Sequence, residues 1–291
     1  MIGVVGGTGG IGRRVVQGLV AAGASPVAIV RDESRARAML GDAVRYATAD
    51  MADAAAMSAA LAGLRSLFLV STVGTDMVAL QSGVIQAARQ AGVEHVVRIS
   101  SIAVGDRSMN VQFARWHERL DGLVESSGVS WTHLRPSNFM RNLLGFAREI
   151  QKTGVLRAPL GDGRLCFVDD GDIAAVAVQA LLRPEHRRRT YVVTGPAWQS
   201  YHEIAAIISE VTERPVTYRA MSLDAARSAW SEAGHPTWFV DDLMAMYGRL
   251  AVATESPVTD HVARVTGRPP RPLRDFIIEH AEVFSPQGPT S

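Results

Sequence analysis

The chain has 291 residues, of which 47% are hydrophobic and 20% charged, an ordinary globular mixture with enough apolar material for a core. Its 30 basic and 29 acidic side chains give a net charge of +1, which leaves no basic field for a nucleic-acid backbone. A lone cysteine, Cys166, excludes an internal disulfide and fits a reducing compartment. No apolar run approaches the ~20 residues of a membrane helix. We therefore expect a cytoplasmic protein without nucleic-acid or membrane partners.

The first half of the chain alternates apolar strands with amphipathic helices. The pattern predicts strands at 2–5, 26–30, 44–49, 67–70, 96–99 and 131–134. It predicts helices at about 11–22, 54–61, 77–91 and 110–127. Near-continuous apolar strands between helices imply a parallel sheet covered on both faces. With right-handed crossovers this is an α/β fold, a doubly wound parallel sheet of the Rossmann type.

The second half is less regular and predicts a smaller α/β domain. Strands are expected at 155–159, 191–194 and 216–218, and helices at 170–182, 202–212, 223–232, 238–253 and 273–284. We divide the chain into a first domain of residues 1–150 and a second of residues 151–291. Segments near 165–195 are expected to return to the first domain, and the tail from residue 285 to be disordered. A homodimer is compatible with this organisation.

A glycine-rich loop follows the first strand and opens the first helix. Its spacing is G-x-x-G-x-x-G, set by Gly6, Gly9 and Gly12. In this context backbone N–H groups and the helix N-terminus face a pyrophosphate, so we predict a dinucleotide site. The alternative is a glycine-rich structural turn, which the strand–loop–helix context disfavours. The expected contacts come from Gly6, Thr8, Gly9, Gly10, Ile11 and Gly12.

The end of the second strand indicates which dinucleotide binds. An NAD site carries an acid there for the ribose hydroxyls, whereas this chain has Arg31, followed by Arg35. A guanidinium can pair with a 2′-phosphate by forked hydrogen bonds, which favours NADP(H) over NAD. Asp32 and Glu33 weaken that preference. The alternative is that Arg31 is a solvated loop residue.

Later strand ends supply further candidate cofactor contacts. Asp50 follows the third strand, where it could bond the adenine edge, and Met51 is next to it. Ser71 and Thr72 follow the fourth strand and would lie beneath the ribose and pyrophosphate. For Asp50, Ser71 and Thr72 a helix- or turn-capping role is an equal alternative.

Together these features resemble the NmrA-like branch of the atypical short-chain dehydrogenases/reductases. The likeness covers nearly the whole chain, and the segments that carry it are Gly6–Gly12, Val30–Arg31, Ser100–Ser101, His117 with Asp121, Ser127–Pro136, Phe139–Asn142, Phe167–Ala174 and Thr266–Pro270. The resemblance implies an extended Rossmann domain, a smaller C-terminal substrate domain and NADP(H) as ligand. It does not imply one activity, because the branch is similar both to NADPH-dependent quinone reductases and to proteins that sense the NADP state without turnover.

The helix after the fifth strand departs from the ordinary short-chain reductase pattern of Tyr-x-x-x-Lys. If His117 takes the lysine position, Phe113 takes the tyrosine position, and Phe cannot donate a proton. Ser101, and less well Ser100, would remain of the usual Ser-Tyr-Lys set. His117 could act as a proton donor near neutral pH or contact the ribose, with Asp121 one turn later to orient it. The alternative is an ordinary helix pair.

The segment after the sixth strand should face the nicotinamide, because ligands bind beyond the carboxyl ends of such strands. Pro136, Asn138 and Phe139 are expected to contact the cofactor. The expected substrate contacts are Ser101, Phe113, Asn138, Phe139, Met140 and Asn142. Trp198 and Phe239 could extend an apolar wall, whereas Trp230 and Trp238 are expected to pack in the smaller domain's core. The eight histidines show no metal-ligand spacing, so no metal site is expected.

Three functions remain open on these residues. The first is an NADPH-dependent oxidoreductase that reduces a quinone-like or aromatic carbonyl compound. The second is a non-catalytic NADP(H) sensor that binds a partner protein, which Phe113 in the tyrosine position favours. The third is a tailoring enzyme of secondary metabolism. Hydride transfer to a quinone needs little acid assistance, since protons can come from water.

Overall fold

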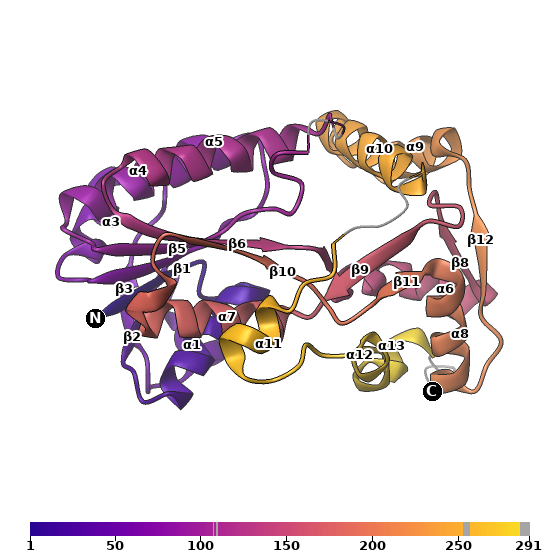
Figure 1. The fold of residues 1–291 in the computed structure, drawn as a ribbon, viewed down its shortest axis with the longest axis horizontal. Helices are drawn as coiled ribbons and strands as arrows, with labels where there is room; N and C mark the ends of the chain where they lie inside the picture. The colour runs from indigo at the N-terminus through magenta and orange to yellow at the C-terminus, as the bar shows by residue number, and fades with distance from the viewer. Residues whose placement is uncertain (107, 109, 253–256, 286–291) are drawn as a thin grey trace.

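A parallel sheet of seven strands forms the larger half of the molecule (Figure 1). The computed structural model describes residues 1–106, 108, 110–252 and 257–285. The sheet order is β10-β6-β5-β4-β1-β2-β3, and every neighbouring pair is parallel. Its strands are β1 (Ile2–Val5), β2 (Pro26–Val30), β3 (Arg45–Thr48), β4 (Ser66–Leu69), β5 (His95–Ile99), β6 (Ser130–Pro136) and β10 (Arg189–Val193). The predicted doubly wound fold is confirmed, and the strand order reverses at β1, where such sheets bind ligands.

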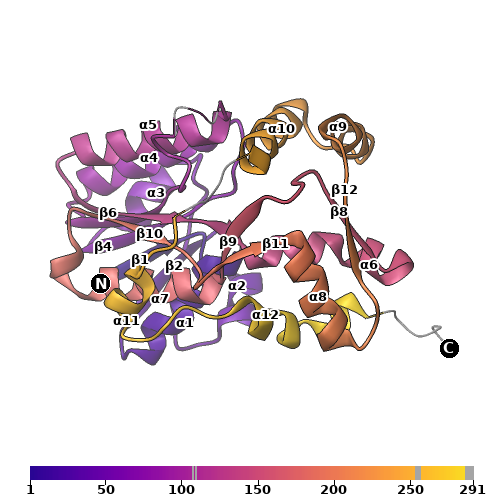
Figure 2. The same cartoon turned by 45° about the vertical axis from the view of Figure 1, so that its right-hand side comes forward.

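Helices cover both faces of this sheet (Figures 1 and 2). One face carries α3 (Ala54–Leu61), α4 (Met77–Gln90) and α5 (Gln112–Ser126). The other carries α1 (Gly10–Ala21), α7 (Asp170–Leu182) and α11 (His261–Thr266). A short helix, α2 (Glu33–Leu40), connects β2 to β3. The sequence patterns missed α2 and α11: Ala36 is the one buried residue of α2, and the six-residue α11 buries Val262 and Val265.

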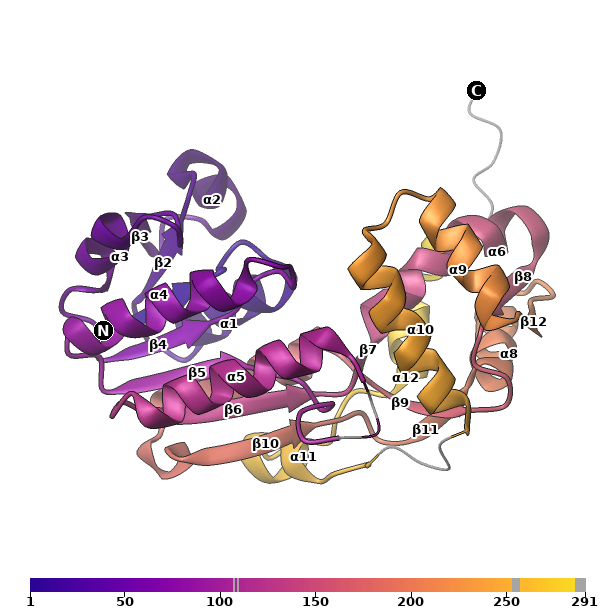
Figure 3. The same ribbon diagram turned by 90° about the horizontal axis from the view of Figure 1, so that it is seen from above.

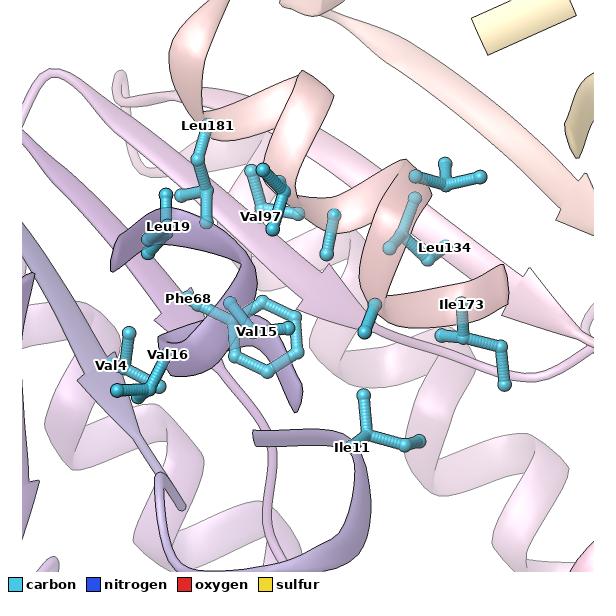
Figure 4. Packing of buried hydrophobic residues seen from close by; sticks show 14 of the residues in the cluster. Val4, Ile11, Val15, Val16, Leu19, Phe68, Val97, Leu134, Ile173 and Leu181 are labelled. Carbon is cyan, nitrogen blue, oxygen red and sulfur yellow. The ribbon is translucent and has the colours of Figure 1, made fainter. Parts of the chain in front are cut away.

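Two apolar layers hold these helices to the sheet. On the α1 side, Ile11, Val15 and Leu19 recur at helical spacing and pack against sheet residues such as Phe68 and Val97 (Figure 4). On the other face, Met57, Leu61, Val84 and Leu120 pack with residues of the strands as the second layer. Burial on both faces explains why these strands read as continuous apolar runs.

The smaller half contains two short sheets and their helices. The strands are β7 (Asn138–Phe139), β8 (Val155–Ala158), β9 (Arg164–Val168), β11 (Trp198–Ser200) and β12 (Thr217–Ala220), ordered β11-β9-β7 and β12-β8. The helices are α6 (Ala147–Thr153), α8 (Tyr201–Thr212), α9 (Leu223–Glu232), α10 (Thr237–Val252), α12 (Leu273–Glu279) and α13 (Ala281–Phe284), with 3₁₀ turns η1 (Met140–Phe146) and η2 (Pro184–His186). A separate apolar cluster fills this half.

The chain passes between the two halves more than once. After β9 it returns to the large sheet as α7 and β10, then leaves again for β11. The expected return near residues 165–195 therefore starts with α7, while the domain boundary at residue 150 stays a prediction. The predicted helix 273–284 is two helices, because His280 leaves helical geometry (φ −111°) and stacks on Phe276. Most of the tail expected to be disordered, residues 286–291, lies outside the described residues.

No helix in the described part of the chain is long and apolar enough to cross a membrane.

Candidate functional site

The loop after β1 has a backbone that only glycine fits. Gly6 has a φ of +79°, and Gly9 N–H donates to the Gly6 carbonyl at 3.0 Å. A Cβ on Gly12 would stand 2.1 Å from the Gly6 carbonyl oxygen, and one on Gly6 would stand 2.5 Å from that of Val70. Close backbone approach at the switch point of the sheet thus requires glycine at positions 6 and 12, whereas a Cβ on Gly9 would meet only the Gly6 carbonyl oxygen, at 3.4 Å.

The loop leaves the start of α1 open. Its N-cap, Gly9, supplies no side-chain hydrogen bond, and the first turn holds no acid. The exposed residues here are Thr8, Gly9 and Gly10. The side chain of Ile11 is buried in the core, and its backbone N–H belongs to the first turn of the helix. Free N–H groups at a helix N-terminus form an anion site, so the loop fits a diphosphate.

An arginine that the sequence analysis did not single out lies beside this opening. Arg141 Nη1 is 2.7 Å from the point where a Cβ on Gly10 would stand. It pairs with Asp170 at 2.6 Å, and its guanidinium lies 4.6 Å from the centre of the Phe139 ring. Burial raises the pKa of Asp170 despite this neighbour. The ion pair spans 29 residues, so no local sequence pattern could have revealed it.

Two unpaired arginines follow β2. Arg31 and Arg35 are exposed, and neither guanidinium pairs with an acid among the described residues. The acids that weakened the NADP prediction are engaged elsewhere. Asp32 caps α2 by accepting from Arg35 N–H at 2.9 Å, and Glu33 pairs with Arg37 at 2.8 Å. The charge left at this strand end is therefore positive, which suits a phosphate and not a ribose diol.

The candidates after β3 and β4 have structural partners as well. Asp50 Oδ1 accepts from Ala52 N–H at 2.8 Å in a turn, and Met51 packs partly against the core. Ser71 accepts from Gln81 at 2.8 Å, whereas Thr72 is exposed. Asp50 thus stabilises the turn before α3, whose N-cap is Asp53, and direct contacts to a cofactor from these residues stay predictions.

A buried polar cluster lies where β5 meets α5. Arg98 is 0% exposed and donates to Gln81 at 2.8 Å, to Asp121 at 2.5 Å and to His117 Nδ1 at 2.9 Å. Asp121 also accepts from Ser100 Oγ at 2.8 Å and from Arg135 at 3.0 Å. Sequence patterns gave no sign of this role for Arg98, because its partners lie on two other elements, Gln81 on α4 and both His117 and Asp121 on α5.

This cluster corrects the predicted roles of His117 and its neighbours. Burial and the nearby Arg98 charge lower the pKa of His117 to about 3, so its ring is neutral near pH 7 and no imidazolium is available as an acid. Asp121 pairs with Arg98 and does not contact His117. The Ser100 hydroxyl points inward to Asp121, which leaves the half-buried Ser101 as the accessible serine of the two.

Phe113 belongs to a small apolar cluster between α5 and α10. Its neighbours are Ala103, Val111, Ala114, Ala245 and Met246. Helix α10 packs beside the start of α5 (Figure 3), and Asp242 accepts from the N–H groups of Gln112 and Phe113 at 2.6 and 2.8 Å. A carboxylate from the other half of the molecule thus supplies the cap that α5 lacks.

Two apolar predictions are wrong in detail. Met140 is 1% exposed in the core of the smaller half, because η1 turns it inward, so it cannot contact a substrate. Trp238 lies outside the smaller half's core: its ring centroid is 5.2 Å from that of Trp116 on α5. Trp230 packs in the smaller half's core, as expected. Asn138 and Phe139 are half-buried, Asn142 is exposed, and Pro136 is buried.

The described residues contain no group of three or more His, Cys, Asp or Glu side chains that could hold a metal. Cys166 is buried, as expected, and burial raises the pKa of its thiol. The site is therefore built from backbone N–H groups, arginines and a neutral histidine.

A family model described as NmrA-like matches residues 1–259. The chain belongs to the NmrA-like family. The chain is 39% identical over 284 residues to NAD(P)H azoreductase of Xenophilus azovorans, covering 98% of this chain and 99% of that protein. The chain is also 37% identical over 287 residues to (4-alkanoyl-5-oxo-2,5-dihydrofuran-3-yl)methyl phosphate reductase of Streptomyces griseus. This match covers 99% of this chain and 100% of that protein.

Among solved structures, the NADPH-dependent quinone oxidoreductase of Escherichia coli complexed with NADPH is similar with a TM-score of 0.87 and 26% identity, covering 96% of this chain and 99% of that one. The resemblance drawn from the sequence is confirmed, and the NmrA-like assignment covers both halves of the molecule.

Proposed function

We propose that this protein is an NADPH-dependent reductase of conjugated acceptors such as quinones and related aromatic compounds. The observation that carries the proposal is the pair of free guanidinium groups, Arg31 and Arg35, beside an uncapped helix N-terminus at the switch point of the sheet. Positive charge at that strand end discriminates a 2′-phosphate from a ribose diol. We further infer action in the cytoplasm, which the lone cysteine favours, and a homodimer as the assembly to look for in solution.

The residues present fit the cofactor at both ends. The Gly6–Gly12 backbone provides N–H donors and the close approach that a diphosphate needs, with Arg141 at its side. Arg31 and Arg35 would hold the 2′-phosphate. When bound, NADPH supplies a hydride. The task of Asn138, Phe139 and Ser101 is to orient the ring and the acceptor at the carboxyl ends of β5 and β6.

The acceptor class follows from the missing acid. Phe113 cannot donate a proton, and His117 is neutral and holds no acidic proton near pH 7. An acceptor that spreads negative charge over a conjugated system needs no strong acid in the transition state, since water can protonate it afterwards. The names of two relatives, an azoreductase and a furanone-type phosphate reductase, support such acceptors and leave room for a role in secondary metabolism.

The NADP(H) sensor is the competing function, and it is favoured by the absence of a tyrosine at position 113. Two relatives that match nearly the full chain are named as reductases, which supports turnover. A difference in affinity between NADP⁺ and NADPH that is coupled to capture of a partner protein, without turnover, would support the sensor.

The cofactor end is tested with Arg31→Ala. Loss of a charge-assisted hydrogen bond of about 1.5–3 kcal/mol should weaken NADPH binding by roughly 10- to 100-fold in calorimetry and leave NADH binding nearly unchanged. The matched control is Arg37→Ala. Arg37 lies on α2, directly after the loop that holds Arg31, but it is paired with Glu33 and Asp42, so its removal should leave the NADPH affinity within about twofold.

The acceptor end is tested by NADPH oxidation over a panel of quinones, azo dyes and simple ketones. We expect turnover of quinones or azo dyes and little with isolated ketones, which need an acid. Tight NADPH binding with no turnover on any compound would overturn the reductase proposal.

A further inference from the structure

The hydrogen bonds of Arg98 constrain the protonation of His117. Arg98 is fully buried and uses separate nitrogens for Gln81, Asp121 and His117 Nδ1. Burial lowers the pKa of Arg98 to about 10, so the guanidinium still carries its proton at neutral pH. A guanidinium has donors only. His117 Nδ1 therefore accepts, and in the neutral ring the hydrogen sits on Nε2.

The other ring nitrogen is available. His117 Nε2 has no hydrogen-bond partner among the described residues, and it is not one of the atoms sealed from solvent without a partner. The residue as a whole is 6% exposed. The one polar atom of the ring that is left unbonded is thus an N–H donor that a ligand can reach.

The charges around His117 keep it neutral. Arg98 of β5 is the charge in contact with the ring. Asp121, on the same helix, is directed at Arg98 and Ser100. From β6, Arg135 and His133 face Asp121, at 3.0 and 3.4 Å.

From α10, Asp242 is bonded to backbone N–H groups one turn earlier on α5. None of these described carboxylates bonds to His117, so nothing on the packed elements stabilises an imidazolium.

We propose that Arg98 is a positioning residue that locks His117 in the Nε2–H form, and that this neutral N–H donates to an oxygen of the bound ligands at the nicotinamide end of the site. The inference rests on the proposed function. The acceptor oxygen belongs either to the nicotinamide ribose of the cofactor or to the substrate. A neutral imidazole N–H polarises an oxygen without releasing a proton, so it works over a wide pH range.

The first test is ¹⁵N NMR of the histidine-labelled full chain with and without NADP⁺. We expect the His117 signals of an unprotonated Nδ1 and a protonated Nε2, unchanged over roughly pH 5 to 8. In Arg98→Met the ring should show both tautomers and begin to titrate in that range. The control is Arg135→Met, which also removes a partner of Asp121 but has no contact with His117, and it should keep the single tautomer.

A protonated Nδ1 in the unmodified protein, or a pH-independent single tautomer in Arg98→Met, would overturn the proposal. Because the unmodified protein alone gives the first answer, a variant that fails to fold does not remove the test. The spectrum without NADP⁺ also separates this inference from the proposed function: a locked tautomer with no NADPH binding would refute the function and leave the Arg98 contact intact.

A second pair of variants identifies the acceptor. His117→Leu removes the N–H, and His117→Gln restores an amide donor. If the ribose accepts, His117→Leu weakens NADP⁺ binding by roughly 5- to 10-fold, and His117→Gln recovers part of it. If the substrate accepts, NADP⁺ affinity is unchanged and kcat falls by a similar factor. Unchanged affinity together with unchanged kcat in His117→Leu would refute the donor role.

Discussion

Individual glycines in the loop after β1 determine whether the site can exist. A methyl group on Gly12 would stand 2.1 Å from the Gly6 carbonyl oxygen, a distance that only movement of the backbone can relieve. That movement would displace the N–H groups that face the diphosphate. The same argument does not apply to glycines whose surroundings are empty.

Gly12→Ala is therefore expected to abolish measurable NADPH binding in calorimetry and to lower the thermal midpoint. Gly122→Ala is the matched control: Gly122 is exposed on helix α5 and has nothing within 4 Å of its added methyl. That change should stabilise the helix by about 1 kcal/mol and leave binding intact. Normal binding in Gly12→Ala would show that the diphosphate does not approach this loop.

At this scale the sequence predicts contacts that are local and misses those that are not. The glycine spacing and Arg31 follow from neighbours in the chain, so both could be identified. Arg98 and Asp121 are 23 residues apart, and the Asp242 contacts span 129 and 130 residues. Met140 was assigned to the wrong face, because the seven-residue 3₁₀ turn η1 that begins with it has no periodic apolar pattern to follow.

At the scale of elements, one buried carboxylate joins α10 to the start of α5, beside the apolar contacts between these two helices. Asp242 is buried and satisfies two N–H groups at the start of α5, which has no side-chain cap of its own. The contact fixes Phe113 relative to Met246 and so defines the apolar surface near the predicted acceptor.

Asp242→Asn should cost about 1–3 kcal/mol of unfolding free energy in urea titrations, because an amide supplies one carbonyl oxygen in place of two charged ones. Amide exchange at Gln112 and Phe113 should accelerate, and the KM for the acceptor should rise more than that for NADPH. Asp241→Asn is the adjacent control. Asp241 is exposed and pairs with Arg227 on the surface, so its loss should cost less than about 1 kcal/mol.

Long elements of the large sheet could be predicted because each buries a continuous or periodic apolar set. The strands β7 and β11 could not, since they have only two and three residues. Helix α2 buries only Ala36, so it has no apolar stripe that would reveal a helical period.

Across the whole molecule, buried neutral histidines link stability to pH. Burial lowers the pKa of His95 and His133 to about 4 and that of His117 to about 3. The unfolded chain takes up protons near the ordinary value of about 6.5, and the folded chain does so only below these values. The unfolded state therefore binds more protons in between, and stability falls as the pH drops from about 6.5 toward 3–4.

His133→Phe should reduce this acid sensitivity. Neither His133 ring nitrogen makes a hydrogen bond among the described residues, and the ring stacks on Trp131 at 4.5 Å, a contact that Phe can keep. The loss of unfolding free energy between pH 7 and pH 4 should shrink by about 1–3 kcal/mol in urea titrations at each pH. His235→Phe, at an exposed position, is the control. Equal losses of unfolding free energy in His133→Phe, His235→Phe and the unmodified protein would contradict the role of His133 in acid sensitivity.

The repeated passage of the chain between the two halves has an evolutionary consequence. Strand β10 lies in the large sheet although it follows β9 of the smaller half, and α11 returns to α7 after α10. Consider two related genes that recombine at a single point near the middle. The product would place β10 and α11 of one parent protein against the large sheet of the other. New specificities are therefore expected to arise by point changes in α10, η1 and the loop after β5, rather than by exchange of whole modules.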